Sequence, residues 1–362
     1  MHNDIYMLWL SSMVALVGSR KLNNILEIFG TARDVFFTNT SEIKERAFLS
    51  AHAGRIFAQN QNLQYIESLL EKMKYSGIAY FSREHERFPA LLKEIPDPPV
   101  GIFCIGTLPS DNTHKVAVIG SRKCSEYGLM AARVLSKPLA EAGVVIVSGM
   151  ARGVDSMAHR GALEGGGKTI AVLGCGVDVC YPSENRNLRK EIIENGCVIS
   201  EYPPETRPAP AFFPARNRII SGLSYGVVVA EAGKKSGTLI TVDQAIDQGR
   251  EVFSVPGNIS SRLSEGTNRL IIEGATPVSD YKDILFSLGI FPEEKNQEEI
   301  ISKKQLAPDE KQVYDSLNFE PVSVDTLMEI TGLNPGRVLF LCAQLEIKGL
   351  VKKIHGSRYI KA

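Results

Sequence analysis

The stretch Val116-Ala-Val-Ile-Gly-Ser-Arg-Lys123 decides the fold of this 362-residue chain. Four apolar residues run without interruption into a glycine, which is typical of a short strand buried on both faces. A helical stretch follows at Tyr127–Ala142, and the alternation of apolar strand and helix then repeats. This pattern predicts an α/β domain with a doubly wound parallel sheet that helices cover on both faces. The further predicted strands are Val144–Gly149, Thr169–Gly174, Cys197–Ser200, Gly226–Glu231 and Val252–Val255, with another helix at Leu239–Gln248.

The segment before this sheet has a helical pattern. Within residues 1–75, apolar residues recur at helical spacing and glycines separate short helices. The segment is similar to small helix-hairpin-helix-like modules, but a purely structural helical domain explains it equally well. We expect the sheet domain at 76–288, with a leading segment at 76–114. The proline-rich stretch at 95–100 in that segment cannot form a regular helix.

The segment after the sheet divides into a linker and a small domain. Residues 289–307 are mostly charged and polar, which predicts a linker. Residues 308–362 have the pattern of three helices followed by a hairpin, which is similar to a winged helix. The predicted helices are Glu310–Leu317, Val324–Ile330 and Pro335–Lys348, and the hairpin turns at 355–357.

Composition and charge limit the possible functions. The formal net charge is zero, which argues against a uniformly basic nucleic-acid binder but leaves room for a local cluster of cations. The apolar stretch at 7–18 is too short to span a bilayer and lacks the basic start of a signal peptide. None of the cysteines forms a metal-binding CxxC pair, so we expect no metal, no membrane association and a reducing, cytoplasmic location. The six cysteines, expected to be small buried thiols, are Cys104, Cys124, Cys175, Cys180, Cys197 and Cys342.

The loop after the first long strand has the chemistry of an anion site. Gly120 lets backbone N–H groups approach a ligand, Ser121 adds a hydroxyl, and Arg122 adds a permanently charged fork. The next helix begins just beyond, so its N-terminal dipole favours negative charge there. The loop is not GxGxxG, and the chain has no GxxxxGK[ST] motif, so we expect no dinucleotide cofactor and no ATP hydrolysis.

The loops that follow the other strands carry similar residues. Each one alone has an ordinary structural explanation, such as helix capping or a surface salt bridge. Together they are expected on one edge of one sheet, because ligands bind beyond the carboxyl ends of parallel strands. Several neighbouring anion sites suit a long polyanion such as a nucleic-acid strand, and an aromatic side chain can stack on the bases of that strand. The candidate residues are Ser148, Gly149, Arg152, Gly153, Gly174, Tyr181, Asn185, Arg186, Phe213, Arg216, Asn217, Arg218, Lys235, Ser236, Gly237 and Thr238.

With these motifs together, the chain resembles the DNA-processing protein A family (DprA, also called Smf). The motifs cover the whole central domain in order, and the helical front and winged-helix tail match the family layout. They are Val118–Arg122, Val147–Asp155, Leu173–Asp178 with Tyr181-Pro182, Phe213–Ile220, Ser236–Thr241 and Val255–Asn258.

The resemblance implies an extended Rossmann-like domain, an N-terminal SAM-like helical domain and a C-terminal winged helix. It implies a non-catalytic protein that binds and protects incoming single-stranded DNA in natural transformation and loads the RecA recombinase. Arg122 matches the family's DNA-contacting arginine, and the loops at 185–186 and 216–218 fall where the family's basic pocket lies. Ser183 stands where relatives can carry lysine, and Arg186 is expected to compensate.

The resemblance also implies a homodimer formed through the Rossmann-like domain. The helix near Gly266–Gly274, with Leu270 and Ile271, is a candidate dimer surface. Burial of the same residues against their own sheet is an equally good reading.

Two other functions fit parts of the sequence. Rossmann-type phosphoribohydrolases place PGGxGTxxE at a helix start, but Thr241 stands where their glutamate would be, and a hydroxyl cannot replace a catalytic carboxylate. Free base released from nucleoside monophosphates would reveal that activity. A winged-helix transcription regulator with a ligand-sensing domain is the second alternative, and it would prefer duplex DNA to single strands.

Overall fold

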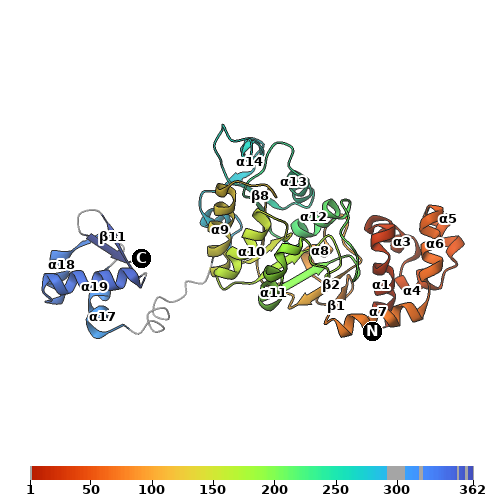
Figure 1. Cartoon of the computed structure of the whole chain (residues 1–362), viewed down its shortest axis with the longest axis horizontal. Coiled ribbons are helices and arrows are strands. Elements are labelled where there is room, and N and C mark those ends of the chain that lie inside the picture. Colours follow the sequence, from red (N-terminus) through yellow and green to blue (C-terminus); the bar gives the residue numbers. More distant parts are fainter. Residues whose placement is uncertain (1, 292–305, 318–320, 349, 355–357, 362) are drawn as a thin grey trace. The chain divides into compact units, whose positions relative to one another are not determined.

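The computed structural model describes residues 2–291, 306–317, 321–348, 350–354 and 358–361. Its contacts divide the chain into two units, 1–291 and 292–362, and each is treated by itself (Figure 1). The predicted linker at 289–307 falls mostly on 292–305, outside the described residues.

A sheet forms the centre of the first unit, and it has nine strands in the described part of the chain. The six predicted strands are all present and pair in parallel, so the predicted α/β fold is confirmed. The strand order is β1-β2-β6-β5-β4-β3-β7-β8-β9. The strands are β1 Ala79–Ser82, β2 Gly101–Gly106, β3 Lys115–Ile119, β4 Val145–Ser148, β5 Thr169–Val172, β6 Gly196–Ser200, β7 Gly226–Val229, β8 Glu251–Ser254 and β9 Thr276–Pro277.

Two strands that sequence patterns did not predict extend the sheet at one edge. β1 and β2 form an antiparallel pair, and β2 continues antiparallel onto β6. The leading segment at 76–114 is therefore part of the sheet.

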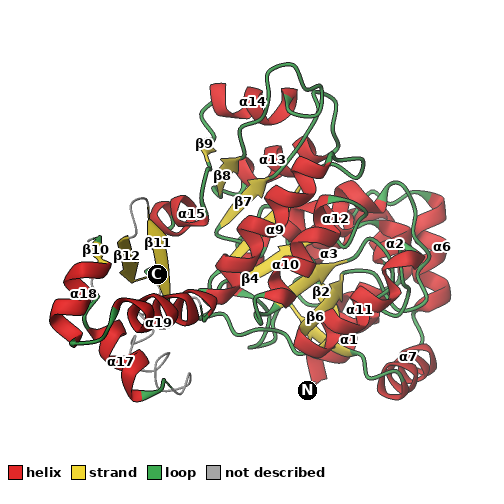
Figure 2. Cartoon of the chain, turned by 60° about the vertical axis from the view of Figure 1, so that its left-hand side comes forward, coloured by secondary structure: helices red, strands yellow, loops and turns green. Residues whose placement is uncertain are grey.

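Helices cover both faces of the sheet, as continuous apolar strands require (Figure 2). Alternate residues of β3 show the division: Val116 and Val118 face α9 and α10, while Ala117 and Ile119 face α12 and α13. The helices are α8 Ala90–Lys93, α9 Glu126–Glu141, α10 Val154–Glu164, η1 Ser183–Asn185, α11 Arg186–Asn195, α12 Phe212–Gly222, α13 Thr238–Asp247, α14 Glu265–Ile272 and α15 Tyr281–Ser287.

The N-terminal helices pack around their own aromatic core and against the edge of the sheet. Trp9 is fully buried, contacts Phe57 edge to face and donates a hydrogen bond to the Asn60 carbonyl at 2.7 Å. The Ser82 hydroxyl of β1 donates to Asp4 at 2.6 Å, which ties these helices to the sheet. The helices are α1 His2–Ser12, α2 Val14–Val17, α3 Ser19–Phe29, α4 Ala32–Phe37, α5 Thr40–Arg46, α6 Ala51–Asn60 and α7 Leu63–Tyr75.

The second unit is a winged helix, as predicted. Its helices surround Leu327, Leu341 and Leu345, and its three-stranded sheet has the order β10-β12-β11. The predicted hairpin turn at 355–357 lies outside the described residues. The elements are α17 Pro308–Asp315, β10 Val322–Ser323, α18 Val324–Thr331, α19 Pro335–Ile347, β11 Val351–Ile354 and β12 Arg358–Lys361.

Candidate nucleic-acid interface

The loops at the carboxyl ends of the parallel strands surround two adjoining cavities. The larger, here the main cavity, has a volume of about 670 Å³. The smaller, here the side cavity, has a volume of about 170 Å³ and shares six lining residues with it. Predicted residues that line the main cavity are Gly120, Ser121, Arg122, Tyr181, Phe213, Arg216, Asn217, Ser236, Gly237 and Thr238, while Gly149, Arg152 and Gly174 line the side cavity.

The loop after β3 needs the residues that sequence analysis singled out. A Cβ at Gly120 would lie 2.6 Å from the Val154 side chain and 2.9 Å from the Glu231 carbonyl oxygen, so only glycine fits. The Ser121 N–H donates to that same carbonyl at 2.8 Å. Held in this way, the loop leaves Arg122 exposed, and no ion pair within the described residues engages its guanidinium.

An aromatic pair stands beside Arg122. The rings of Tyr181 and Phe213 lie 5.5 Å apart at 33°, and the Arg122 guanidinium carbon lies 5.0 Å from the centre of the Phe213 ring. Tyr181 is 43% exposed. The arrangement places π-faces and a cation at one opening, which is the chemistry that single-strand binders use for bases and phosphates.

The start of α13 forms the opposite wall of the main cavity. The N-cap residue Gly237 supplies no capping side chain, and Ser236 takes over that role. The Thr238 N–H donates to the Ser236 hydroxyl at 3.3 Å, the Leu239 N–H donates to the Ser236 carbonyl at 3.1 Å, and the Ser236 hydroxyl donates to the Thr238 hydroxyl at 2.9 Å. The positive end of the helix dipole still favours an anion beside this turn. Lys234 and Lys235 are exposed just before this turn, although Lys235 lines neither cavity.

Arg216 and Asp155 form the floor of the main cavity. Arg216 is only 4% exposed and donates to the Gly149 carbonyl at 2.7 Å and to the Val172 carbonyl. Burial raises the pKa of Asp155, and Arg216 counteracts it. Burial likewise lowers the pKa of Arg216, and Asp155 counteracts that shift. Arg216 therefore shapes the floor and adds positive potential, with its Nη1 group hydrogen-bonded to two backbone carbonyls and its Nε group hydrogen-bonded to Asn217.

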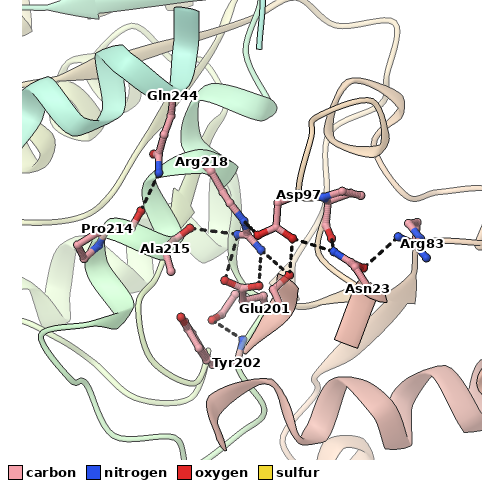
Figure 3. A network of polar contacts seen from close by, with 12 residues as sticks. Asn23, Arg83, Asp97, Glu201, Tyr202, Pro214, Ala215, Arg218 and Gln244 are labelled. Carbon is pink, nitrogen blue, oxygen red and sulfur yellow. Dashed lines mark hydrogen bonds and ion pairs between the residues drawn. The ribbon is translucent and has the colours of Figure 1, made fainter. Parts of the chain in front are cut away.

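Arg218 does not lie in either cavity, contrary to the expectation from the sequence. It is 6% exposed, and its guanidinium contacts Glu201 at 2.7 Å and Asp97 at 3.2 Å (Figure 3). Burial disfavours its charge, but the two carboxylates hold its pKa above the ordinary value. A guanidinium neutralised by two internal carboxylates has no capacity left for a phosphate. Arg218 is a structural residue.

The contacts of Arg218 continue into the N-terminal helices. Its guanidinium also donates to the Ser19 hydroxyl at 2.9 Å. Asp97 accepts a hydrogen bond from Asn23 at 2.8 Å, and Arg83 donates to Asn23 at 3.1 Å (Figure 3). The helix that carries Phe213 is thus fixed to α3 by a buried polar network.

Ser148 and Asn185 are also structural. The Ser148 hydroxyl is buried and donates to the Val118 carbonyl at 2.7 Å. The Asn185 amide donates to the Met150 carbonyl at 2.9 Å and to the Ser156 hydroxyl at 2.8 Å. Both side chains are 7% exposed or less and line neither cavity, so they are not available to a ligand.

The remaining predicted residues lie at the rim or support it. Arg152 is exposed but paired with Glu184, and Arg186 is exposed at the start of α11, outside both cavities. Gly153 has a φ of +77°, and a Cβ there would lie 2.9 Å from the Arg122 carbonyl oxygen. The backbone conformation and this close contact therefore require glycine at position 153.

Sequence analysis missed several residues of the main cavity. Lys123 is exposed beside Arg122, and its position next to that residue was the available signal. Pro210 comes from the loop after β6, and Ile240 and Thr241 from α13. Pro210 has no local signal, whereas Ile240 and Thr241 belong to the motif Ser236–Thr241 but were not chosen as ligand residues.

All six cysteines are free thiols, of which Cys124 and Cys180 are half-buried and the others buried. No cluster of three or more His, Cys, Asp or Glu suited to a metal was found among the described residues. No helix in that part of the chain is long and apolar enough to cross a membrane.

Comparison with known proteins now bears on this geometry. The family model of DNA recombination-mediator protein A matches residues 79–289, and that of the DprA winged helix domain matches residues 301–357. The chain belongs to the DNA recombination-mediator protein A family. Protein Smf of Synechocystis is 33% identical over 340 residues, which cover 84% of this chain and 85% of that protein. DNA processing protein DprA of Streptococcus pneumoniae is 46% identical over 217 residues, which cover 57% of this chain and 77% of that protein.

Two solved structures of family members resemble this chain. DprA from Streptococcus pneumoniae matches with a TM-score of 0.67 at 38% identity, over 79% of this chain and 97% of that one. DNA processing protein A from Helicobacter pylori matches with a TM-score of 0.53 at 32% identity, over 58% of this chain and 95% of that one. The latter structure concerns the single-stranded DNA binding mode of the Helicobacter protein.

Proposed function

We propose that this chain binds single-stranded DNA, with phosphates at the rim of the main cavity and bases against Tyr181 and Phe213. The observation that carries the proposal is the joint position of Arg122, the aromatic pair and the start of α13 around one cavity. Arg122 and Lys123 are exposed cations that form no ion pair within the described residues, although the charge of Arg122 acts on the buried Asp155. Phosphate contacts of this kind supply most of the affinity of sequence-independent binding.

The single-stranded DNA binding of the Helicobacter relative supports the proposal. Family membership also supports a finer reading: the chain protects incoming single-stranded DNA and loads RecA recombinase during natural transformation, in the cytoplasm. It acts there by binding and not by catalysis.

The family resemblance further supports a homodimer through the sheet domain. In the candidate helix α14, Leu270 is 8% exposed and packs against its own sheet, while Ile272 is 77% exposed. We therefore place the proposed dimer contact at Ile272 and not at Leu270. An Ile272→Asp variant is expected to shift the mass measured by light scattering from dimer to monomer.

A nucleotide hydrolase is the main alternative, and the cavity does not favour it. Thr241 lies in α13 at the cavity wall, 3% exposed, where the hydrolases place a glutamate. The carboxylate in the floor, Asp155, is held by the Ala151 N–H at 3.3 Å and faces Arg216. Incubation with nucleoside monophosphates is expected to release no free base.

The experiment that tests the proposal is a titration of fluorescent single-stranded and duplex DNA of equal length at two salt concentrations. We expect tighter binding of the single strand and a marked loss of affinity at the higher salt. Equal or tighter binding of the duplex would favour a winged-helix regulator instead.

A further inference from the structure

A third cavity lies on the same edge of the sheet, beyond the main cavity. Its volume is about 360 Å³, and it lies between the start of α9, the end of β7 and the loop at 256–264 that follows β8. We refer to this segment as the β8 loop. The lining residues are Ser125, Tyr127, Glu231, Pro256, Gly257, Asn258, Ser261 and Ser264.

The third cavity continues the line of the other two. The loop after β3 contributes Ser121 to Lys123 to the main cavity and Ser125 to the third, and Tyr127 follows in the first turn of α9. Because β3, β7 and β8 are neighbours in the sheet, their carboxyl ends follow one another at about 4.8 Å. The distance from β3 to β8 is therefore about 10 Å, or about three nucleotides of a stacked strand at 3.4 Å each.

The β8 loop is rigidly built around this cavity. Asn268 anchors it with two hydrogen bonds of 3.0 Å, one from the Gly257 N–H and one to the Gly257 carbonyl. The Tyr127 hydroxyl of α9 donates to the Pro256 carbonyl at 2.7 Å. A Cβ at Gly257 would overlap the Ser264 side chain, so the loop closes tightly at its base. The cavity is thus preformed.

The lining has the chemistry of a nucleobase site and not of a phosphate site. Hydroxyl and amide groups predominate, and the one charged group is the Glu231 carboxylate, 2% exposed and hydrogen-bonded by the Ser125 N–H and hydroxyl at 2.7 and 2.6 Å. A buried carboxylate repels phosphate, whereas a base offers a neutral edge with N–H donors and carbonyl acceptors.

Cations lie outside the cavity, where the phosphates would run. Arg262 of the β8 loop is exposed, and its carbonyl oxygen lies 3.1 Å from the position of a Cβ on Gly233. Arg262 therefore belongs to the loop that touches the turn carrying Lys234 and Lys235. None of these three cations has an ion pair within the described residues. Ile259 at the loop tip is 93% exposed and offers an apolar surface to a base.

We propose that the strand continues from the main cavity across the β3 loop, places a base in the third cavity and is held there through its phosphate by Arg262. This inference rests on the proposed function and adds a second binding site for the same DNA strand. It assigns to the β8 loop the role of lengthening the bound stretch of DNA.

The test uses the full chain and oligonucleotides of about 2 and about 12 nucleotides, because the shorter one cannot span the roughly three nucleotides between the two cavities and the longer one can. Arg262→Ala removes the phosphate contact, and Ser261→Leu fills the cavity. Ser287→Leu is the matched control, since Ser287 lies exposed at the end of α15 and lines none of the three cavities. Arg122→Ala reports on the main cavity.

We expect Arg262→Ala to weaken the long oligonucleotide roughly tenfold, the effect of one lost charge-assisted contact. Ser261→Leu should weaken it by a similar factor because the base loses its cavity. Both variants should leave the short oligonucleotide within about twofold. Ser287→Leu should leave both unchanged, and Arg122→Ala should weaken both. The proposal is overturned if the two loop variants change neither oligonucleotide while Arg122→Ala still weakens both. It is equally overturned if the loop variants weaken both lengths alike. If Arg122→Ala changes neither, the proposed function of the main cavity fails first.

Discussion

Two arginines near the carboxyl edge of the sheet have opposite environments. Arg122 follows β3, is exposed and lies over the Phe213 ring, with no carboxylate partner in the described part of the chain. Arg218 lies on the same helix as Phe213, yet it is buried between Glu201 and Asp97. The charge of Arg122 is therefore available to a ligand, whereas the charge of Arg218 stabilises the fold. The comparison shows that a basic residue in a binding motif can be assigned to a phosphate contact only after the structure has shown whether a carboxylate already pairs with it.

The largest expected effect is the loss of stability on substitution of the buried arginine, Arg218. Arg218→Ala leaves Glu201 unpaired in the interior and should lower the free energy of unfolding by about 3–5 kcal/mol. Arg122→Ala removes an exposed side chain and should change it by no more than about 0.5 kcal/mol. Urea denaturation of both variants checks the difference, and equal stabilities would contradict it.

A second buried group should make stability depend on pH. Burial, with a contribution from Arg216, lowers the pKa of His159 to about 3, and its ring hydrogen-bonds Thr169 at 2.7 Å. In the unfolded chain His159 takes up a proton near pH 6.5, whereas in the folded chain it stays neutral down to about pH 3. The free energy of unfolding is therefore at its full value above pH 6.5 and falls as the pH drops toward 3. Between pH 6.5 and 4 the loss is on the order of 3 kcal/mol.

Unfolding curves of wild type and His159→Gln between pH 4 and 7 measure this contribution. The wild type should show an extra slope of up to about 1.4 kcal/mol per pH unit that the variant lacks. Parallel curves would mean that His159 does not titrate in this way.

On the exposed side, Arg122→Ala should weaken single-stranded DNA about tenfold or more, the loss of one hydrogen bond to a charged group. Arg122→Lys should recover only part of the affinity, because lysine lacks the planar fork. Lys168→Ala is the control, since Lys168 is exposed just before β5 at the opposite edge of the sheet. Fluorescence anisotropy measures all three, and an equal loss in the control would make the effect nonspecific.

The aromatic contact should have a similar or smaller effect. Phe213→Leu keeps an apolar side chain but removes the stacking face, which is worth about 1–3 kcal/mol per base. Tyr225→Leu, at the amino end of β7, changes an aromatic on the opposite edge and should leave binding unchanged. If Phe213→Leu binds like wild type, bases do not stack at this position.

The smallest effect is expected from removal of the winged helix. Residues 308–362 carry about as many acids as bases, and none of them is needed to build the three cavities. A chain that ends at residue 307 should bind single-stranded DNA within about twofold of the full chain. A collapse of affinity would move the binding site to the winged helix.

The sequence predicted the central fold because its signal is local. Each buried strand is a continuous apolar run, and Gly120 with Ser121 marks the anion loop directly after one of them. β2 was missed because it pairs with β6, which lies about a hundred residues further along the chain, and β1 joins the sheet only through β2. Antiparallel addition at an edge leaves little trace in a pattern of parallel strands.

Residues of the candidate site were predictable from the sequence only where the type of side chain alone indicates a contact with DNA. Arg122 and Phe213 lie at the main cavity, as expected. Arg218 was misplaced because its partners, Glu201 and Asp97, are 17 and 121 residues away in sequence. The third cavity was not predicted, because only the fold of the β8 loop places its hydroxyl groups beside Ser125.

The most direct test of this account is the salt dependence of single-strand binding. The variants to compare with wild type are Arg122→Ala and the neutral pair Arg218→Gln/Glu201→Gln, on one oligonucleotide. The account predicts that the slope of log K against log salt flattens by about 0.7 for Arg122→Ala, which loses one phosphate contact, and stays unchanged for the neutral pair. An unchanged slope for Arg122→Ala, or a slope flattened equally in the neutral pair, would contradict it.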